Sequence, residues 1–252
     1  MKNTNISLVI GFHAVEDLLQ SDITVGKVYV NAKADKQKVG VLRKLTKERN
    51  VPLQMVPIEK LNRLTRANHQ GVIAFKSPID YVPLEETITR MYEAGKMPKI
   101  VVADGIQDIR NIGAIARNCM AFDVDLLVVG TKANAEIGEG AIKSSAGALL
   151  KLPVARVRSL AETLDYLKNW GIRQIGTNER AETVLEPGLV NKSDAWALWM
   201  GNENKGLSRE RVALLDKLVR IPMSSSIDSL NVSVAAGIAL YCLYSTEPPH
   251  SQ

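Results

Sequence analysis

The sequence predicts an α/β protein in which a small α/β unit precedes a larger unit built on a parallel sheet. Short apolar runs alternate mostly with helical patterns after residue 99, as strands do in a parallel sheet covered on both faces. They are residues 100–103, 126–129, 154–157, 174–176, 195–200 and 218–221. Residues 77–83 contain two prolines and follow no period, which is typical of a linker. The predicted units are therefore residues 1–76 and 84–252.

The first unit shows short elements of both kinds. Apolar periodicity predicts, in order, a helix over 11–19, a strand over 27–30, a helix over 39–49, a strand over 52–56, a helix over 58–64 and a strand over 71–75. In the second of these helices the expected inward residues are Val41, Leu42 and Leu45. The expected outward residues are Lys38, Arg43, Lys44 and Lys47.

Charge is distributed unevenly along the chain. Residues 1–82 hold 13 Lys and Arg against 7 Asp and Glu, a net charge of +6. The other 170 residues hold 19 against 20, a net charge of −1. Such asymmetry indicates that the first third binds a polyanion, with an ordinary solvated surface as the alternative.

Several classes of protein are disfavoured. Cys119 and Cys242, the two cysteines, both lie in helical patterns, which indicates buried thiols in a reducing compartment rather than a disulfide or a metal site. The sequence has no cluster of Cys and His that would indicate a metal site. It also has no run of eighteen apolar residues that would predict a membrane span. The first residues lack the apolar core of a secretory signal, so we expect a cytoplasmic protein. The usual nucleotide-binding glycine motifs are absent.

Polar residues gather where the last predicted strand turns into a long helix. Pro222 ends the strand because it lacks a backbone donor, and a serine-rich loop follows. Either Ser226 or Asp228 is expected to cap the helix. Ser229 and Asn231 have no obvious role in a core. Since ligands of open parallel sheets bind outside the carboxyl ends of the strands, we expect the site here.

The same helix carries two lines of side chains at a spacing of four. One line is apolar and consists of Leu230, Val234 and Ile238. The other is small and consists of Ser229, Ser233 and Gly237. Small residues allow another backbone to approach closely. Tyr241 adds apolar surface, so we expect a second copy of the chain to pack on this helix.

Residues 102–117 predict another strand, loop and helix. Asn111 stands where an N-cap is expected, and Gly113, Ala114 and Arg117 share one helix face. An arginine above two very small residues has open space before it, which suits a guanidinium that binds a phosphate or a ribose oxygen. An ordinary surface arginine is the alternative.

Residues 198–208 form a third strand-end loop. Gly201 and Gly206 allow tight turns, Glu203 lies between them, and Ser208 is expected to cap the next helix.

These motifs resemble the SpoU/TrmH family of RNA ribose 2'-O-methyltransferases. Ile221-Pro222-Met223 and Ser229-Leu230-Asn231-Val232-Ser233 resemble the third family motif, with Ser225 where the family usually has Gly. Gly201-x-Glu203-x-x-Gly206 is similar to the second motif, and Asn111 and Arg117 match the Asn and Arg of the first. Gly11-x-His13-Ala14-Val15 and Asn68-His69-Gln70-Gly71 resemble a ribosomal-protein-like RNA-binding domain found in one branch of the family.

The resemblance implies a fold and a set of roles. The second unit would be a SPOUT methyltransferase domain with a C-terminal trefoil knot, which forms a homodimer through its last helix. S-adenosylmethionine would be the cofactor, bound by Thr177, Gly201, Ile221 and Leu230. The implied catalytic residues are Asn111, Arg117, Glu203, Ser229 and Asn231. The family assigns proton acceptance to Arg117, but a guanidinium stays protonated, so we expect it to bind a phosphate and stabilise an oxyanion.

The target is less closely defined. The first unit most resembles that of family members methylating a guanosine of 23S ribosomal RNA. A tRNA 2'-O-methyltransferase and a catalytically silent RNA-binding protein are the alternatives. The group that accepts the hydroxyl proton stays open.

Overall fold

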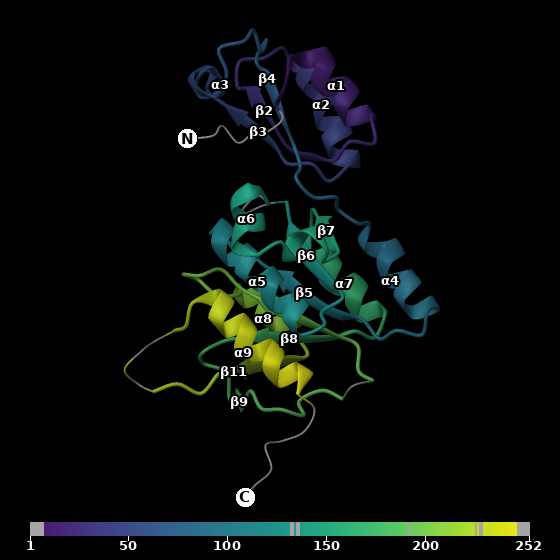
Figure 1. Cartoon of the computed structure of the whole chain (residues 1–252), viewed down its shortest axis with the longest axis vertical. Helices are drawn as coiled ribbons and strands as arrows, with labels where there is room; N and C mark the ends of the chain where they lie inside the picture. The colour runs from purple at the N-terminus through teal and green to yellow at the C-terminus, as the bar shows by residue number, and fades with distance from the viewer. Residues whose placement is uncertain are drawn as a thin grey trace, which may run out of the picture. The chain divides into compact units, whose positions relative to one another are not determined.

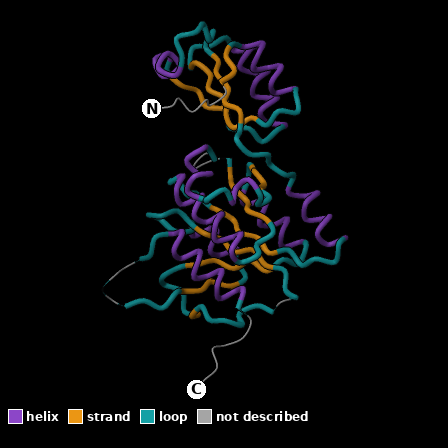
Figure 2. The backbone as a smooth tube through the Cα atoms, viewed as in Figure 1, coloured by secondary structure: helices purple, strands orange, loops and turns teal. Residues whose placement is uncertain are grey.

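The computed structural model describes residues 8–131, 134, 137–191, 193–224, 226 and 229–245 (Figure 1). The chain divides into two compact units, Met1–Asp80 and Tyr81–Gln252. In each unit the strands lie at the centre and helices lie outside them (Figure 2).

The first unit is a four-stranded mixed sheet in the order β1-β4-β2-β3. Its elements are β1 (Leu8–Ile10), α1 (Phe12–Gln20), β2 (Val25–Asn31), α2 (Lys36–Glu48), β3 (Leu53–Val56), α3 (Ile58–Leu64) and β4 (Val72–Lys76). Strand β2 pairs with β3 in parallel and with β4 in the antiparallel sense. The three predicted helices and three predicted strands are confirmed. Sequence reasoning missed β1, because a three-residue strand is too short to show a period.

Helix α2 differs from its prediction in which side chains face the core. It begins at Lys36, where the Asp35 carboxylate caps it by accepting from two backbone amides. Its buried residues are Val39, Leu42 and Thr46. At about 100° per residue, Val41 falls well off that face, and it is 41% exposed. The inward placement of Val41 was therefore wrong, whereas the expected outward lysines and arginine are confirmed.

The predicted linker forms hydrogen bonds at both of its ends. The Ser77 amide donates to the Thr24 carbonyl, and the Thr24 hydroxyl donates to Asp80. On the other side, the Val82 amide donates to the Val154 carbonyl. The first half of the segment thus belongs to the first unit and its end to the second.

The second unit is a seven-stranded sheet in the order β7-β6-β5-β10-β8-β11-β9, and all of its pairings are parallel. Its strands are β5 (Lys99–Ala103), β6 (Leu126–Gly130), β7 (Val154–Val157), β8 (Arg173–Thr177), β9 (Thr183–Val184), β10 (Trp196–Met200) and β11 (Lys217–Arg220). Its helices are α4 (Leu84–Glu93), α5 (Ile109–Ala121), α6 (Glu139–Ser144), the 3-10 turn η1 (Ala148–Leu150), α7 (Leu160–Asn169), α8 (Arg209–Leu214) and α9 (Val232–Tyr244). The six predicted strands are confirmed, and only the two-residue β9 was missed.

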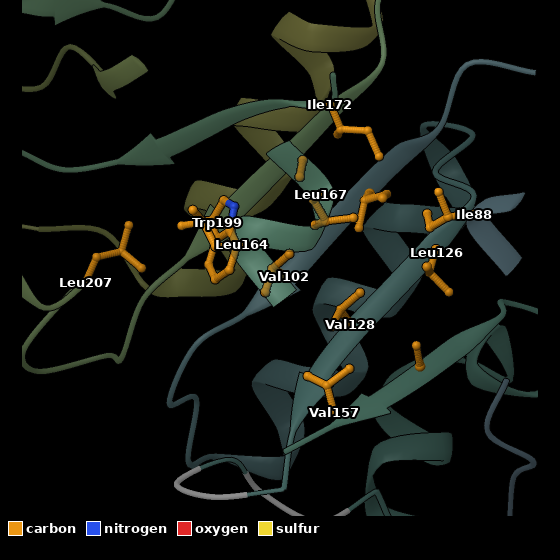
Figure 3. Packing of buried hydrophobic residues seen from close by; sticks show 13 residues of the cluster. Ile88, Val102, Leu126, Val128, Val157, Leu164, Leu167, Ile172, Trp199 and Leu207 are labelled. Carbon is orange, nitrogen blue, oxygen red and sulfur yellow. The ribbon is translucent and has the colours of Figure 1, made fainter. Parts of the chain in front are cut away.

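Alternation along the strands explains their nearly continuous apolar character. Val102 and Val128 point to a face covered by α4 and α7, where Ile88 and Leu164 complete a buried cluster (Figure 3). The intervening residues, such as Val101, point to the opposite face and are buried as well. Helices α5 and α9 pack together on that second face (Figure 1).

The strand order places a switch point between β5 and β10. From β5 the chain moves outward through β6 and β7, whereas β8 and β11 lie on the other side of β10. In open α/β sheets, ligands bind at the carboxyl ends of strands beside such a point. The trefoil knot stays a prediction.

Both cysteines are free thiols in the interior, as predicted. Burial raises the pKa of the Cys119 thiol, which is therefore neutral. Within the described ranges, no group of three or more His, Cys, Asp or Glu residues is arranged to hold a metal ion. None of the described helices has the length and apolar character needed to cross a membrane.

Candidate functional site

The loop after β10 closes tightly on itself. The Asn202 amide donates to the Gly206 carbonyl at 3.1 Å, and the Gly206 amide returns a bond to the Asn202 carbonyl at 2.8 Å. A Cβ atom on Gly201 would lie 2.3 Å from the Gly206 carbonyl carbon, so position 201 has no room for a side chain. Gly206 has a φ of 64°, which favours glycine. These two glycines fix the loop that carries Glu203.

The Glu203 carboxylate joins this loop to the loop after β5. Its Oε1 accepts from the Asp108 amide and the Asn111 side-chain amide, each at 3.1 Å. Its Oε2 accepts from the Gln107 amide at 3.2 Å and from Asn202 Nδ2 at 3.5 Å. The neighbouring strands β5 and β10 are thus connected at their carboxyl ends, at the switch point.

Hydrogen bonding decides the ionisation of Glu203. Partial burial alone raises the pKa of its carboxyl group. The bonds from Asn111 and from backbone amides outweigh that effect, and the pKa lies below its ordinary value of 4.5. Glu203 is therefore ionised at neutral pH, and both of its oxygens accept hydrogen bonds.

Asn111 extends the network to the last helix. Its Oδ1 accepts from Asn231 Nδ2 at 3.1 Å, while its own Nδ2 donates to Glu203. Asn231 Oδ1 accepts from the amide of Ser233 at 2.9 Å, and so caps α9. A single chain of side chains, Glu203 to Asn111 to Asn231, connects the three sequence motifs.

Two expectations about helix caps need correction. Asp108, not Asn111, caps α5, since its carboxylate accepts from the Arg110 amide. Asn111 lies inside the helix and is buried. Helix α9 is capped by Asn231, so the assignment to Ser226 was wrong; the other candidate, Asp228, lies outside the described residues, as does Ser225. An Asx residue directly before the periodic run was the better signal in both helices.

Four segments enclose a cavity of about 810 Å³ beside the network. All four predicted cofactor residues line it, namely Thr177, Gly201, Ile221 and Leu230. Glu203 and Ser229 line it as well. Its volume lies in the range of small-molecule and cofactor sites, about 300–1,000 Å³. Ile221, Leu230 and Val232 supply apolar wall beside these polar groups.

Arg117 lies apart from the cavity. Its side chain is exposed on α5, and within the described part of the chain it has no hydrogen bond or ion pair. The expected open space above Gly113 was wrong: a Cβ there would lie 1.9 Å from Ser144 Oγ and 2.4 Å from the Ala141 carbonyl oxygen. Gly113 therefore allows α6 to pack on α5. Arg117 is free to meet a partner outside the chain.

Sequence reasoning missed Asn202 and several cations. Asn202 Nδ2 donates to the Gly105 carbonyl at 2.7 Å, and its Oδ1 accepts from the amides of residues 204 and 205. An Asn beside a Gly in a turn was the available signal. The cavity is also lined by Arg180, Lys205 and Arg209, for which the sequence offers no spacing rule.

The fold and the site together define an open α/β unit with a cavity at the carboxyl ends of β8, β10 and β11, beside the switch point. Residues 98–241 match the model of the SpoU rRNA methylase family, and residues 8–82 match the model described as RNA 2'-O ribose methyltransferase substrate binding. A "Putative TrmH family tRNA/rRNA methyltransferase" of Staphylococcus haemolyticus is 31% identical over 237 residues, 94% of each chain. This chain belongs to the SpoU/TrmH family of RNA methyltransferases.

Solved structures agree with the fold. The SpoU methyltransferase AviRb from Streptomyces viridochromogenes, in complex with AdoMet, matches with a TM-score of 0.57 and 24% identity, over 93% of this chain and 88% of that one. The TrmH/SpoU tRNA modifying enzyme of A. aeolicus matches with a TM-score of 0.52 and 32% identity, over 65% of this chain and 83% of that one.

Proposed function

We propose that the protein transfers a methyl group from S-adenosylmethionine to a ribose 2'-hydroxyl of RNA. The observation that carries this proposal is the hydrogen-bonded chain of Glu203, Asn111 and Asn231, which lies beside the cavity lined by Thr177 and Leu230. A silent RNA-binding protein would need neither the network nor the cavity. The roles assigned below rest on this arrangement and on family membership.

The cavity suits S-adenosylmethionine. Gly201, Ile221 and Leu230 would hold the cofactor with Thr177, in a space with both apolar walls and polar groups. AviRb and an rRNA methyltransferase from Sinorhizobium meliloti are described with AdoMet bound, which supports the same cofactor here. When bound, this cofactor supplies an already activated methyl group.

The residues of the chain then have to position the ribose and manage its charge. Glu203 is not the proton acceptor, because its pKa is lowered and its oxygens are occupied by donors. It fixes Asn111 instead, and Asn111 in turn fixes Asn231. Ser229 offers an exposed hydroxyl at the cavity wall, where it can orient the ribose. Such positioning supplies much of the rate in group transfer.

Arg117 acts on the RNA rather than on the cofactor. Its guanidinium is exposed and has no partner among the described residues. It presents a planar fork of donors suited to a phosphate. From there it stabilises charge that develops on the ribose oxygen.

A guanosine of 23S ribosomal RNA is the proposed target. The basic first unit, which matches a substrate-binding model over residues 8–82, supports RNA as the substrate of the full chain. Relatives of known structure include tRNA-modifying enzymes, so tRNA is the alternative substrate. Residues 1–76 are proposed to hold the RNA and residues 84–252 to carry the methyl transfer.

We also assign a homodimer to the outer side of α9. Val234, Ile238 and Tyr241 are 50%, 37% and 57% exposed, and Met120 of α5 is 42% exposed. A two-fold interface would cover this apolar ridge. The small line is not part of it: Gly237 faces Asn118 within the same chain, and Ser229 precedes the helix.

Transfer of a labelled methyl group tests the proposal. The full chain is incubated with S-adenosylmethionine and either ribosomal RNA or tRNA, both lacking modifications, and the labelled nucleotide is mapped. Label on a ribose of 23S ribosomal RNA is expected. Label only on tRNA would change the substrate, and tight RNA binding without any transfer would favour the silent RNA-binding protein.

A further inference from the structure

Helix α2 carries a line of cations that the chain itself does not use. Lys36, Arg43 and Lys47 are exposed, and no acidic side chain in the described part of the protein pairs with them. At about 100° per residue they lie within about 40° of one another around the helix and extend over about 16 Å of its length. This line, together with Gly40, is called the basic stripe below.

Other cations of the same unit have internal roles. Arg49 donates to the carbonyls of Leu18 and Ser21, at 3.2 and 2.7 Å, and so holds the end of α1. Lys38 is also on α2 but lies over the Phe12 ring, 5.3 Å from its centroid, on the other side of the helix. The basic stripe thus differs from these cations in offering charge without an internal partner.

Gly40 lies in the middle of the stripe and has no structural explanation. A glycine inside an exposed helix costs about 0.5–1 kcal/mol relative to alanine. Glycine can serve where a neighbour approaches closely, yet a Cβ at position 40 would meet no atom within 4 Å beyond the nearby backbone of its own helix. The layer of side chains therefore has an open gap at this position, between Lys36 and Arg43.

We infer that the basic stripe binds the sugar-phosphate backbone of the RNA substrate, with Gly40 as the point of closest approach. The inference rests on the proposed function, since RNA is the polyanion that a methyltransferase of this family would hold. Cations on both sides of a gap in the side-chain layer allow a backbone to lie against the helix while each phosphate meets a Lys or Arg. Such contacts position the RNA without reading its sequence.

Two variants of the full chain test the charge of the stripe and the open space at Gly40 separately. The first combines Lys36→Gln, Arg43→Gln and Lys47→Gln, with Lys38→Gln on the opposite side as its control. The second is Gly40→Gln, which adds bulk but no charge. Glutamine favours helices more than glycine does, so Gly40→Gln should raise the melting temperature of this unit by about 2–8 °C. A loss of binding therefore cannot be due to unfolding.

Affinity for 23S ribosomal RNA transcribed in vitro is measured between about 50 and 200 mM salt. Removal of three contacts should reduce the slope of log affinity against log salt by about 2, at about 0.7 per phosphate of a single strand. Lys38→Gln should leave that slope unchanged. Gly40→Gln should bind about tenfold more weakly with an unchanged slope, because it obstructs without removing charge.

The outcomes distinguish this inference from the proposed function. A triple variant with the wild-type slope, or Gly40→Gln with wild-type affinity, would overturn the stripe even if the protein methylates RNA. Conversely, a protein that transfers no methyl group but loses RNA binding in both variants would retain the stripe and lose the proposed activity.

Discussion

The two units of this protein differ in how many of their charged side chains form ion pairs. Six ion pairs between Lys or Arg and Asp or Glu join described residues, and all six lie in the second unit. Asp104 and Arg211 form one of them, 3.0 Å apart and partly buried next to the loops of the site. In the first unit the stripe of α2 remains open to solvent. The charged pairs of the second unit contribute to its internal order, whereas the cations of the stripe have no acidic partner among the described residues.

The same contrast separates residues within the site. Glu203 and Asn111 are held by several hydrogen bonds each, at the point where two strand-end loops meet. Arg117, six residues along α5 from Asn111, has none within the described residues. The residues proposed to keep one geometry are therefore held by the fold, whereas the residue proposed to contact RNA is not.

The largest effect is expected at Arg117. Arg117→Ala should slow methyl transfer about 10²- to 10³-fold, the usual cost of removing a group that stabilises an oxyanion. Arg117→Lys should also be poor, because a point charge cannot replace the planar fork. Affinity for S-adenosylhomocysteine, measured by calorimetry, should stay nearly unchanged, since Arg117 does not line the cavity. A large loss of that affinity would place Arg117 at the cofactor instead.

Replacement of Glu203 should have a smaller effect on rate and a measurable one on stability. Glu203→Gln places an NH₂ group opposite the N–H donors that the carboxylate accepts from. The Asn111 side chain should then lose its orientation, and methyl transfer should slow up to about 10²-fold. The lost charge-assisted bonds should lower the free energy of unfolding by about 1.5–3 kcal/mol. Glu93→Gln, on the exposed surface at the end of α4, is the matched control; it should leave the rate unchanged and the free energy of unfolding within about 0.5 kcal/mol.

The pH dependence of this stability has a defined sign. Folding lowers the pKa of Glu203 below 4.5. The carboxylate therefore contributes stability above that pH, and the contribution disappears as the pH falls through the folded pKa. The difference in melting temperature between the wild type and Glu203→Gln should narrow below about pH 4.5. A constant difference down to pH 3 would mean that the charge is not responsible.

Most of the fold could be predicted because its signals are local. The strands of the second unit are buried on both faces, so each appears as an apolar run between helical patterns. The strands that escaped, β1 and β9, have three and two residues and carry no period. The face of α2 was misjudged through Val41, because Val41 lies about 100° from Leu42 and about 200° from Val39 around the helix.

The site was only partly predictable for a different reason. Residues at strand ends, such as Thr177 and Glu203, follow from the architecture of parallel sheets and from the family motifs. Contacts between distant segments do not: the Gln107 amide reaches Glu203 across 96 residues of sequence. The neighbours of Gly113 and Gly237 could not be predicted from the sequence either, since a small residue is compatible with a free surface, a ligand or a neighbouring helix.

The two sides of α9 provide the smallest and most specific test. Gly237 lies against Asn118, whose Nδ2 is 3.1 Å from the position of a Cβ and donates to the Ser233 carbonyl at 2.8 Å. Gly237→Leu should therefore force α5 and α9 apart within one chain, at a cost of about 1–3 kcal/mol, and lower the melting temperature.

Ile238→Asp, one residue further along, changes a residue of the exposed ridge. It should instead dissociate the proposed dimer, because a two-fold interface buries the new charge twice. Light scattering at micromolar concentration separates the cases: a wild-type monomer would remove the dimer from the proposal, and dissociation by Gly237→Leu without a change in melting temperature would return Gly237 to the interface between chains.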